Sequence, residues 1–223
     1  MELFEAFPEW GELPPFEGKR ISLVGISAIL YDDEAYYFEV GKPRFWARRA
    51  SGVRSVGVGG IGGRIELGER PIEALRREVR EEVGAGIDLQ VPSRTALLDA
   101  GDIAAWLEFA SDGEEPVPYF VSLFPPRLGG PRVPDHLAIV TFLGRPEGQP
   151  RRGDLFGLIT VARGSLAAFF EPDEWLLDDA LSHPSFSVDL TDELPPGAML
   201  RPKLRARAFQ VLVRAGHHRD ASW

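Results

Sequence analysis

A glycine-rich loop that leads directly into a helix with three carboxylates limits most strongly what this chain can fold into. Four glycines fall among the five residues 59–63, after a run of small and β-branched residues at 53–58. Glycines in such number end a strand and allow the backbone to approach a ligand closely. The pattern predicts a strand, a tight loop and a helix in succession.

The predicted helix covers residues 71–83. Pro71 suits the first helical position, and Gly84 suits the position just beyond the C-terminal end. Apolar residues recur at spacings of three and four residues, which predicts one buried helix face. They are Ile72, Leu75, Val79 and Val83.

Three carboxylates of this helix, Glu78, Glu81 and Glu82, share one sector beside the apolar face. Like charges at these spacings destabilise an isolated helix by about 0.2–0.5 kcal/mol per pair, and a bound cation reverses that effect. Mg²⁺ takes one or two carboxylates together with waters and substrate phosphates. The alternative is a solvated acidic face, because exposed charge is the norm.

The composition excludes several classes of chemistry. The chain has 223 residues, enough for one large domain with a hydrophobic core, and it has no cysteine. Disulfides, thiolate zinc sites and a cysteine nucleophile are therefore excluded. The four histidines lack metal-type spacing, and no serine-hydrolase elbow, Walker loop or dinucleotide fingerprint occurs.

The charge balance argues against nucleic acid as a partner. The formal net charge is −9, from 34 acidic and 25 basic residues, and a negative field opposes polyanions. A small anionic substrate is still compatible with this negative net charge, since a metal or a local group of cations overrides the field. Five arginines lie just before and inside the glycine loop: Arg44, Arg48, Arg49, Arg54 and Arg64.

The N-terminal region and the apolar runs bear on location. Residues 1–10 are acidic and aromatic, so we predict no signal peptide. The longest apolar stretch, 21–31, is interrupted by small polar residues and is too short to span a bilayer. We expect a cytoplasmic protein with no membrane partner.

The remaining elements are predicted from local patterns. Strands are expected at 19–31, 36–40, 95–98, 119–124, 137–143 and 157–162, and short helices at 102–109, 166–170 and 173–181. Residues 1–19 and 184–202 read as irregular, and 203–215 as a basic amphipathic helix.

The helix and its loop resemble a known family signature. Gly63, five residues, Glu69, seven residues, Arg77-Glu78-Val79, one residue, Glu81-Glu82, one residue and Gly84 match the Nudix box. Ala85 departs from it, because a larger aliphatic residue is usual there. The resemblance extends more loosely over residues 20–175.

The resemblance implies a Nudix fold of the α/β (α+β) class, with a mixed β-sheet sandwiched between helices. The implied Nudix domain is 20–175, with the box at 63–85 and an inserted segment at about 86–136. Residues 1–19 are then an irregular lead-in, and 176–223 a C-terminal helical extension packed on the domain.

The resemblance also implies a metal-dependent hydrolase that cleaves a diphosphate linkage in a nucleoside diphosphate derivative, with Mg²⁺ or Mn²⁺ as the cofactor. By position, Glu78 and Glu82 are the main metal ligands, Glu81 assists, and the Gly63 carbonyl completes the shell. Glu78 is the first choice for the general base, and 114–115 supplies two outside candidates, both glutamates.

Other residues take supporting roles by the same resemblance and by their chemistry. Arg77 is expected to orient the loop carboxylate Glu69 through a charge-assisted hydrogen bond. Arg64 and Arg48 are candidates for binding a small nucleotide-type substrate. Trp46 is a candidate for stacking on its base.

Two other functions stay open on the same fold. A non-catalytic Nudix sensor or regulator is the alternative, although such proteins are expected to lose box glutamates and to carry a DNA-binding appendage. Isopentenyl diphosphate isomerase chemistry is disfavoured because no cysteine is present. The terminal helix leaves a homodimer possible. A nucleotide-sugar or ADP-ribose-like compound is the default expectation for the substrate, and the sequence does not identify it further.

Overall fold

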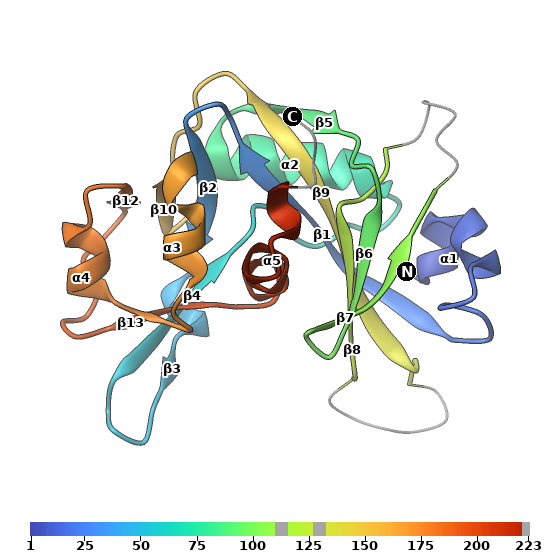
Figure 1. Cartoon of the computed structure of the whole chain (residues 1–223), viewed down its shortest axis with the longest axis horizontal. Helices are drawn as coiled ribbons and strands as arrows, with labels where there is room; N and C mark the ends of the chain where they lie inside the picture. The colour runs from blue at the N-terminus through green and yellow to red at the C-terminus, as the bar shows by residue number, and fades with distance from the viewer. Residues whose placement is uncertain (110–115, 127–132, 220–223) are drawn as a thin grey trace.

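The strands form one mixed β-sheet in a computed structural model that describes residues 1–109, 116–126 and 133–219 (Figure 1). Nine strands follow one another along the main path of hydrogen bonding. In that order they are β11 (Trp175–Leu176), β13 (Met199–Pro202), β4 (Arg54–Gly59), β2 (Ala35–Val40), β1 (Ile21–Tyr31), β9 (His136–Glu147), β8 (Phe120–Phe124), β6 (Thr95–Asp99) and β7 (Asp102–Leu107).

Four further strands attach to this path. β10 (Gly157–Ala162) pairs with β2 and with β12 (Phe186–Leu190), β3 (Ala47–Arg48) pairs with β4, and β5 (Gly86–Gln90) pairs with β9. The pairs β1–β9, β13–β4 and β6–β8 are parallel, and the others are antiparallel. The sheet is therefore mixed, as predicted.

Helices cover both faces of the sheet, which confirms the predicted fold class. They are α1 (Leu3–Ala6), α2 (Pro71–Val83), α3 (Leu166–Phe170), α4 (Leu177–Ser182) and α5 (Arg205–Arg214). One core gathers apolar side chains of α2 and the N-terminal segment, and a second core gathers those of α3 and α5. In Figure 1, α5 is seen end-on between strands β4 and β7, both of which it contacts.

Helix α2 forms where its end signals predict. The Glu73 carboxylate accepts a hydrogen bond from the Arg70 backbone N–H at 3.2 Å, and Gly84 ends the helix with a φ of 64°. Leu75, Val79 and Val83 are fully buried. Burial of side chains of this size stabilises the fold by about 1.5–3 kcal/mol each, so the apolar face fixes the rotation of α2 on the sheet.

The predicted helix at 102–109 is wrong, because β7 occupies residues Asp102–Leu107. A tight turn reverses the chain directly after β6, with positive φ at Ala100 and Gly101. Asp99 pairs with Asp102 across it, and antiparallel pairing of the two strands follows. Tertiary pairing therefore outweighs the local helical pattern.

Two segments predicted to be irregular are ordered. Residues 184–202 contain β12 and β13, which pair with β10 and β4. Within 1–19, α1 is followed by a 3₁₀ turn, and Leu3, Trp10 and Phe16 are buried. Distant strands stabilise 184–202, whereas the N-terminal segment is stabilised by stacking of Trp10 on Phe7 and Phe16 and by its contact with the distant Phe109.

Among the residues that the structure describes, no helix combines the length and the hydrophobicity needed to cross a membrane.

Candidate active site

The glycine loop after β4 is held against β1 by backbone hydrogen bonds. The N–H of Ala28 donates to the Ile61 carbonyl at 2.8 Å, and the N–H of Ile26 donates to the Gly63 carbonyl at 3.0 Å. Gly62 has a φ of 134°, and a Cβ there would overlap the Ile26 carbonyl oxygen. Only glycine suits that position, and the loop is fixed just before the carboxylate helix.

Three carboxylates gather at this loop: Glu78 and Glu82 from α2, and Glu39 from β2. The backbone N–H of Gly62 donates to Glu82 Oε2 at 2.7 Å. Burial and the neighbouring Glu39 carboxylate raise the pKa of Glu82 to about 8, and burial also raises the pKa of Glu39. Carboxyl groups that are buried next to one another resist ionisation. A cation bound between them would stabilise their ionised forms.

The glycines of the loop provide the space that these carboxylates occupy. A Cβ on Gly59 would overlap the Glu39 carboxylate, and a Cβ on Gly63 would overlap the Glu78 carboxylate. The absence of side chains therefore brings the two acidic groups against the backbone of the loop. The glycine loop and the Glu39 and Glu78 carboxylates are therefore packed directly against each other.

Arg77 connects the loop to the carboxylate helix. Its Nε and Nη2 donate to the two oxygens of Glu69 at 2.9 and 3.0 Å, and Nη1 donates to Glu78 Oε1 at 2.9 Å. Further bonds reach Glu81 Oε2 and the Arg64 carbonyl, both at 3.2 Å. The bidentate bond from Arg77 lowers the pKa of Glu69, so both partners stay charged.

The box glutamates Glu78 and Glu81 differ in solvent exposure. The side chain of Glu81 is 52% exposed, and that of Glu78 is 16% exposed. Glu81 therefore lies at the solvent edge of the site, while Glu78 lies between Arg77 and Gly63. The Gly63 carbonyl accepts the bond from Ile26 and keeps one lone pair for another partner.

We expect Arg77→Lys to lower kcat about 10- to 100-fold, as loss of an orienting group does at metal sites. A lysine keeps the charge, but one ammonium group cannot replace the fork that bonds to Glu69 and Glu78 together. The free energy of unfolding should fall by about 1–2 kcal/mol, measured with urea.

The matched control is Arg76→Lys, because Arg76 is exposed and precedes Arg77 on the same helix. It should leave kcat and stability close to those of the unchanged protein. If the two variants behaved alike, the orienting role of Arg77 would be wrong.

A large cavity of about 1470 Å³ lies beside the glycine loop. Gly59, Gly63 and Glu39 line it, whereas Glu78 and Glu82 are not among its lining residues. Cations from the loop and from the C-terminal segment form another part of its wall: Arg64, Arg201, Lys203, Arg205 and Arg207. The cavity wall therefore carries both acidic and basic groups.

Apolar side chains complete the wall. Eight large hydrophobic residues are exposed in the described part of the chain, and five of them line this cavity. An exposed apolar patch beside polar groups is typical of a ligand site. The five are Met1, Val24, Phe45, Leu67 and Leu204.

The structure brings some of the predicted substrate-binding residues to the cavity and not others. Arg64 lines it, but Arg48 and Trp46 are not among its lining residues. The indole N–H of Trp46 donates to the Gly41 carbonyl at 2.7 Å, and its ring packs against Phe156. The glutamates at 114–115 lie outside the described residues.

Glu39 is a carboxylate of the site that the motif does not contain. It stands in β2 between Phe38 and Val40, which are buried. A lone acidic residue in an otherwise apolar strand is costly unless it has a partner or a function. The position of a single acidic residue in an apolar strand is therefore the sequence signal that identifies Glu39 as a candidate site residue.

The carboxylates do not form a finished metal site. Within residues 1–109, 116–126 and 133–219, no group of three or more Asp, Glu or His side chains is arranged to hold a metal ion. The donor set itself is of the right kind, because clustered carboxylates and a backbone carbonyl suit a hard divalent cation.

A mixed sheet between helices, with a glycine loop that leads into a carboxylate helix, defines the fold class of the Nudix hydrolases. The family model described as NUDIX domain matches residues 23–188, and the chain belongs to that family. The class predicted from the box, a Nudix pyrophosphohydrolase, is confirmed by this membership. Enzymes of the family act on small nucleotide-derived substrates and generally use divalent metal ions.

Several solved structures are similar to this chain at low sequence identity. The MutT NUDIX hydrolase from Burkholderia pseudomallei is 17% identical, with a TM-score of 0.35, over 89% of this chain and 99% of that one. The MutT protein from Bacillus halodurans is 17% identical, with a TM-score of 0.31, over 65% and 71%. A UDP-X diphosphatase is 14% identical, with a TM-score of 0.36, over 96% and 71%. No curated protein matches the sequence.

Proposed function

We propose that this protein hydrolyses the diphosphate linkage of a nucleoside diphosphate derivative, by attack of water at phosphorus, with Mg²⁺ or Mn²⁺ as the cofactor. The observation that carries the proposal is the gathering of Glu39, Glu78 and Glu82 at a glycine loop that borders a large, partly cationic cavity. The carboxylates suit a metal ion, and the cations of the wall suit phosphate oxygens.

The residues that would hold the ion are Glu78 and Glu82, with assistance from Glu81 and the Gly63 carbonyl. Glu39 adds a carboxylate from the neighbouring strand. Their side chains must converge further when an ion binds, because they do not yet form a closed set of ligands. A bound divalent cation neutralises the charge that develops on the phosphate oxygens.

The chain's own groups divide the remaining work. Glu78 is the first candidate to accept the proton of the attacking water, since it lies against Gly63 and is held by Arg77. Arg77 and Glu69 fix the loop relative to α2. The apolar wall suits the base or the second moiety of a nucleotide-sugar or ADP-ribose-like substrate.

A panel of nucleoside diphosphate derivatives tests the proposal. We expect nucleotide or sugar-phosphate release with Mg²⁺ or Mn²⁺, and release should stop when EDTA is added in excess. Product analysis by chromatography identifies which phosphorus is attacked.

The same experiment decides against the sensor alternative. Tight binding of a nucleotide without turnover under either ion would favour a non-catalytic sensor. The complete set of box glutamates argues against that outcome, because a sensor has no need to keep them.

A further inference from the structure

The C-terminal segment supplies cations to the same face of the sheet that carries Glu39. Arg201 on β13 pairs directly with Gly57 on β4, and Glu39 on β2 pairs directly with Gly59. Residues opposite each other, or two apart on one strand, share a face. A row therefore runs across three strands, from cation through two glycines to carboxylate.

Lys203 belongs to the same row. It follows β13 directly, and its backbone N–H donates to the Val58 carbonyl at 2.9 Å. A Cβ on Gly57 would lie 2.8 Å from Lys203 Cδ, so the lysine stem lies across the face of that glycine. Gly57 thus makes room for a cation in the same way that Gly59 makes room for a carboxylate.

Among the described residues, the two cations form no ion pair, although Arg201 lies close enough to Glu174 to help lower the pKa of that carboxyl group. In the described part of the chain, neither Arg201 nor Lys203 takes part in a salt bridge or a side-chain hydrogen bond. Six arginines, by contrast, each form an ion pair at 3.3 Å or less: Arg49, Arg77, Arg145, Arg152, Arg207 and Arg214. Unpaired cations that line a cavity in a chain of net charge −9 indicate an anionic ligand.

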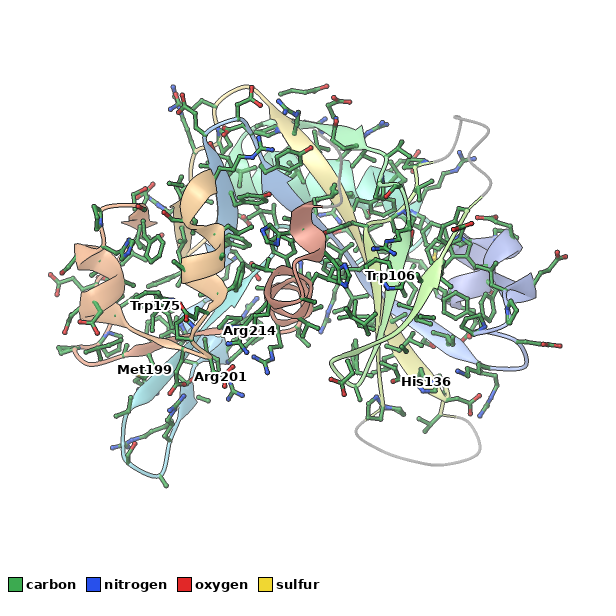
Figure 2. All side chains as sticks on the ribbon, in the orientation of Figure 1. Trp106, His136, Trp175, Met199, Arg201 and Arg214 are labelled. Atoms are coloured by element: carbon green, nitrogen blue, oxygen red, sulfur yellow. The ribbon has the colours of Figure 1, made fainter. Side chains whose placement is uncertain are left out.

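Arg205 ties this segment to the glycine loop. Its Nη1 donates to the Gly60 carbonyl at 3.3 Å and also to the Gly62 carbonyl. Between Lys203 and Arg205, Leu204 has a φ of 44°, which is strained for a leucine. The turn fixes the segment beside the loop, and it also fixes the spacing between its cations and the carboxylates. Arg201 lies in Figure 2 close to Met199, also on β13, and below α5 in that view.

We propose that Arg201 and Lys203 bind the phosphate oxygens of the substrate and hold its diphosphate next to the Glu39 carboxylate, which lies over Gly59. The inference rests on the function proposed above and names the part of the chain that recognises the phosphates. It makes β13 and the turn after it a wall of the active site.

The test uses Lys203→Gln and Arg201→Gln in the full chain, with Lys19→Gln as the control that removes one positive charge outside the cavity. We expect each site variant to raise KM about 10-fold with little change in kcat, since one charge-assisted hydrogen bond is lost. Lys203→Arg should restore KM to within about 3-fold, because it keeps the charge. Melting curves check that every variant is folded.

A second measurement does not depend on turnover. Calorimetry with inorganic pyrophosphate in metal-free buffer should show weaker binding, by about 10-fold, in Lys203→Gln than in Lys19→Gln. Equal pyrophosphate affinity and equal KM in these two variants would overturn the inference, while turnover by the unchanged protein would leave the proposed function intact. If the unchanged protein hydrolysed nothing in the panel, the function would be wrong, and the pyrophosphate comparison would still decide whether this wall binds phosphate.

Discussion

Replacement of Glu82 by glutamine should lower metal-dependent turnover about 100- to 1000-fold while the protein stays folded. The Glu82 carboxylate lies at the glycine loop with Glu39 and Glu78, and its Oε2 accepts the Gly62 N–H. Glutamine keeps the shape and can still accept that hydrogen bond through its amide oxygen, but it cannot ionise to the carboxylate that a cation binds. Steady-state kinetics with Mg²⁺ and Mn²⁺ measure the loss.

We expect Mg²⁺ to raise the melting temperature of the unchanged protein, since a ligand that binds only the folded state stabilises it, and we expect the same variant to lose that increase. Glu9→Gln removes one negative charge from an exposed position and serves as the control. It should keep both turnover and the Mg²⁺ effect. Retention of both in Glu82→Gln would show that Glu82 holds no metal.

The second large effect is expected from Gly63→Ala. The added methyl group overlaps the Glu78 carboxylate, which must move away from the loop. Because that carboxylate is the end of a flexible side chain, the fold should tolerate the change with a loss of about 1 kcal/mol or less. Turnover should nevertheless fall about 100-fold, because misplacement of a catalytic group by an ångström has that cost.

Two other glycines distinguish displacement of the Glu78 carboxylate from a change in the loop backbone. Gly164 has open space around its α-carbon and no positive φ, so Gly164→Ala should be neutral. Gly68 has a φ of 82° and equally open space, so Gly68→Ala should strain the backbone without touching a carboxylate. A turnover loss in Gly68→Ala as large as in Gly63→Ala would assign the effect to loop conformation and not to Glu78.

The sequence predicts the box well because its information is local. Pro71, Gly84 and the apolar spacing of α2 define a helix without reference to the rest of the chain. The fixed spacing of the box likewise predicts which side chains share the loop. The Nudix fold and the hydrolase class follow from that one segment, and both are confirmed.

The parts that could not be predicted depend on partners far away in the sequence. β13 is a strand because it lies between β4 and β11, and β7 is a strand because β6 pairs with it across a tight turn. Glu39 joins the box carboxylates through pairing of β2 with β4. No periodicity within these segments records such pairings.

The parallel pairing of β13 with β4 also has a consequence for biosynthesis. Arg201 lies next to Gly57, so one edge of the pocket joins segments that are far apart in the sequence. On the ribosome, the box emerges early, but its pocket stays open on the side of β13 until residue 203 has been made. Contacts of such long sequence separation are slow to form, so we expect the phosphate binding proposed for Arg201 and Lys203 to arise only late in folding.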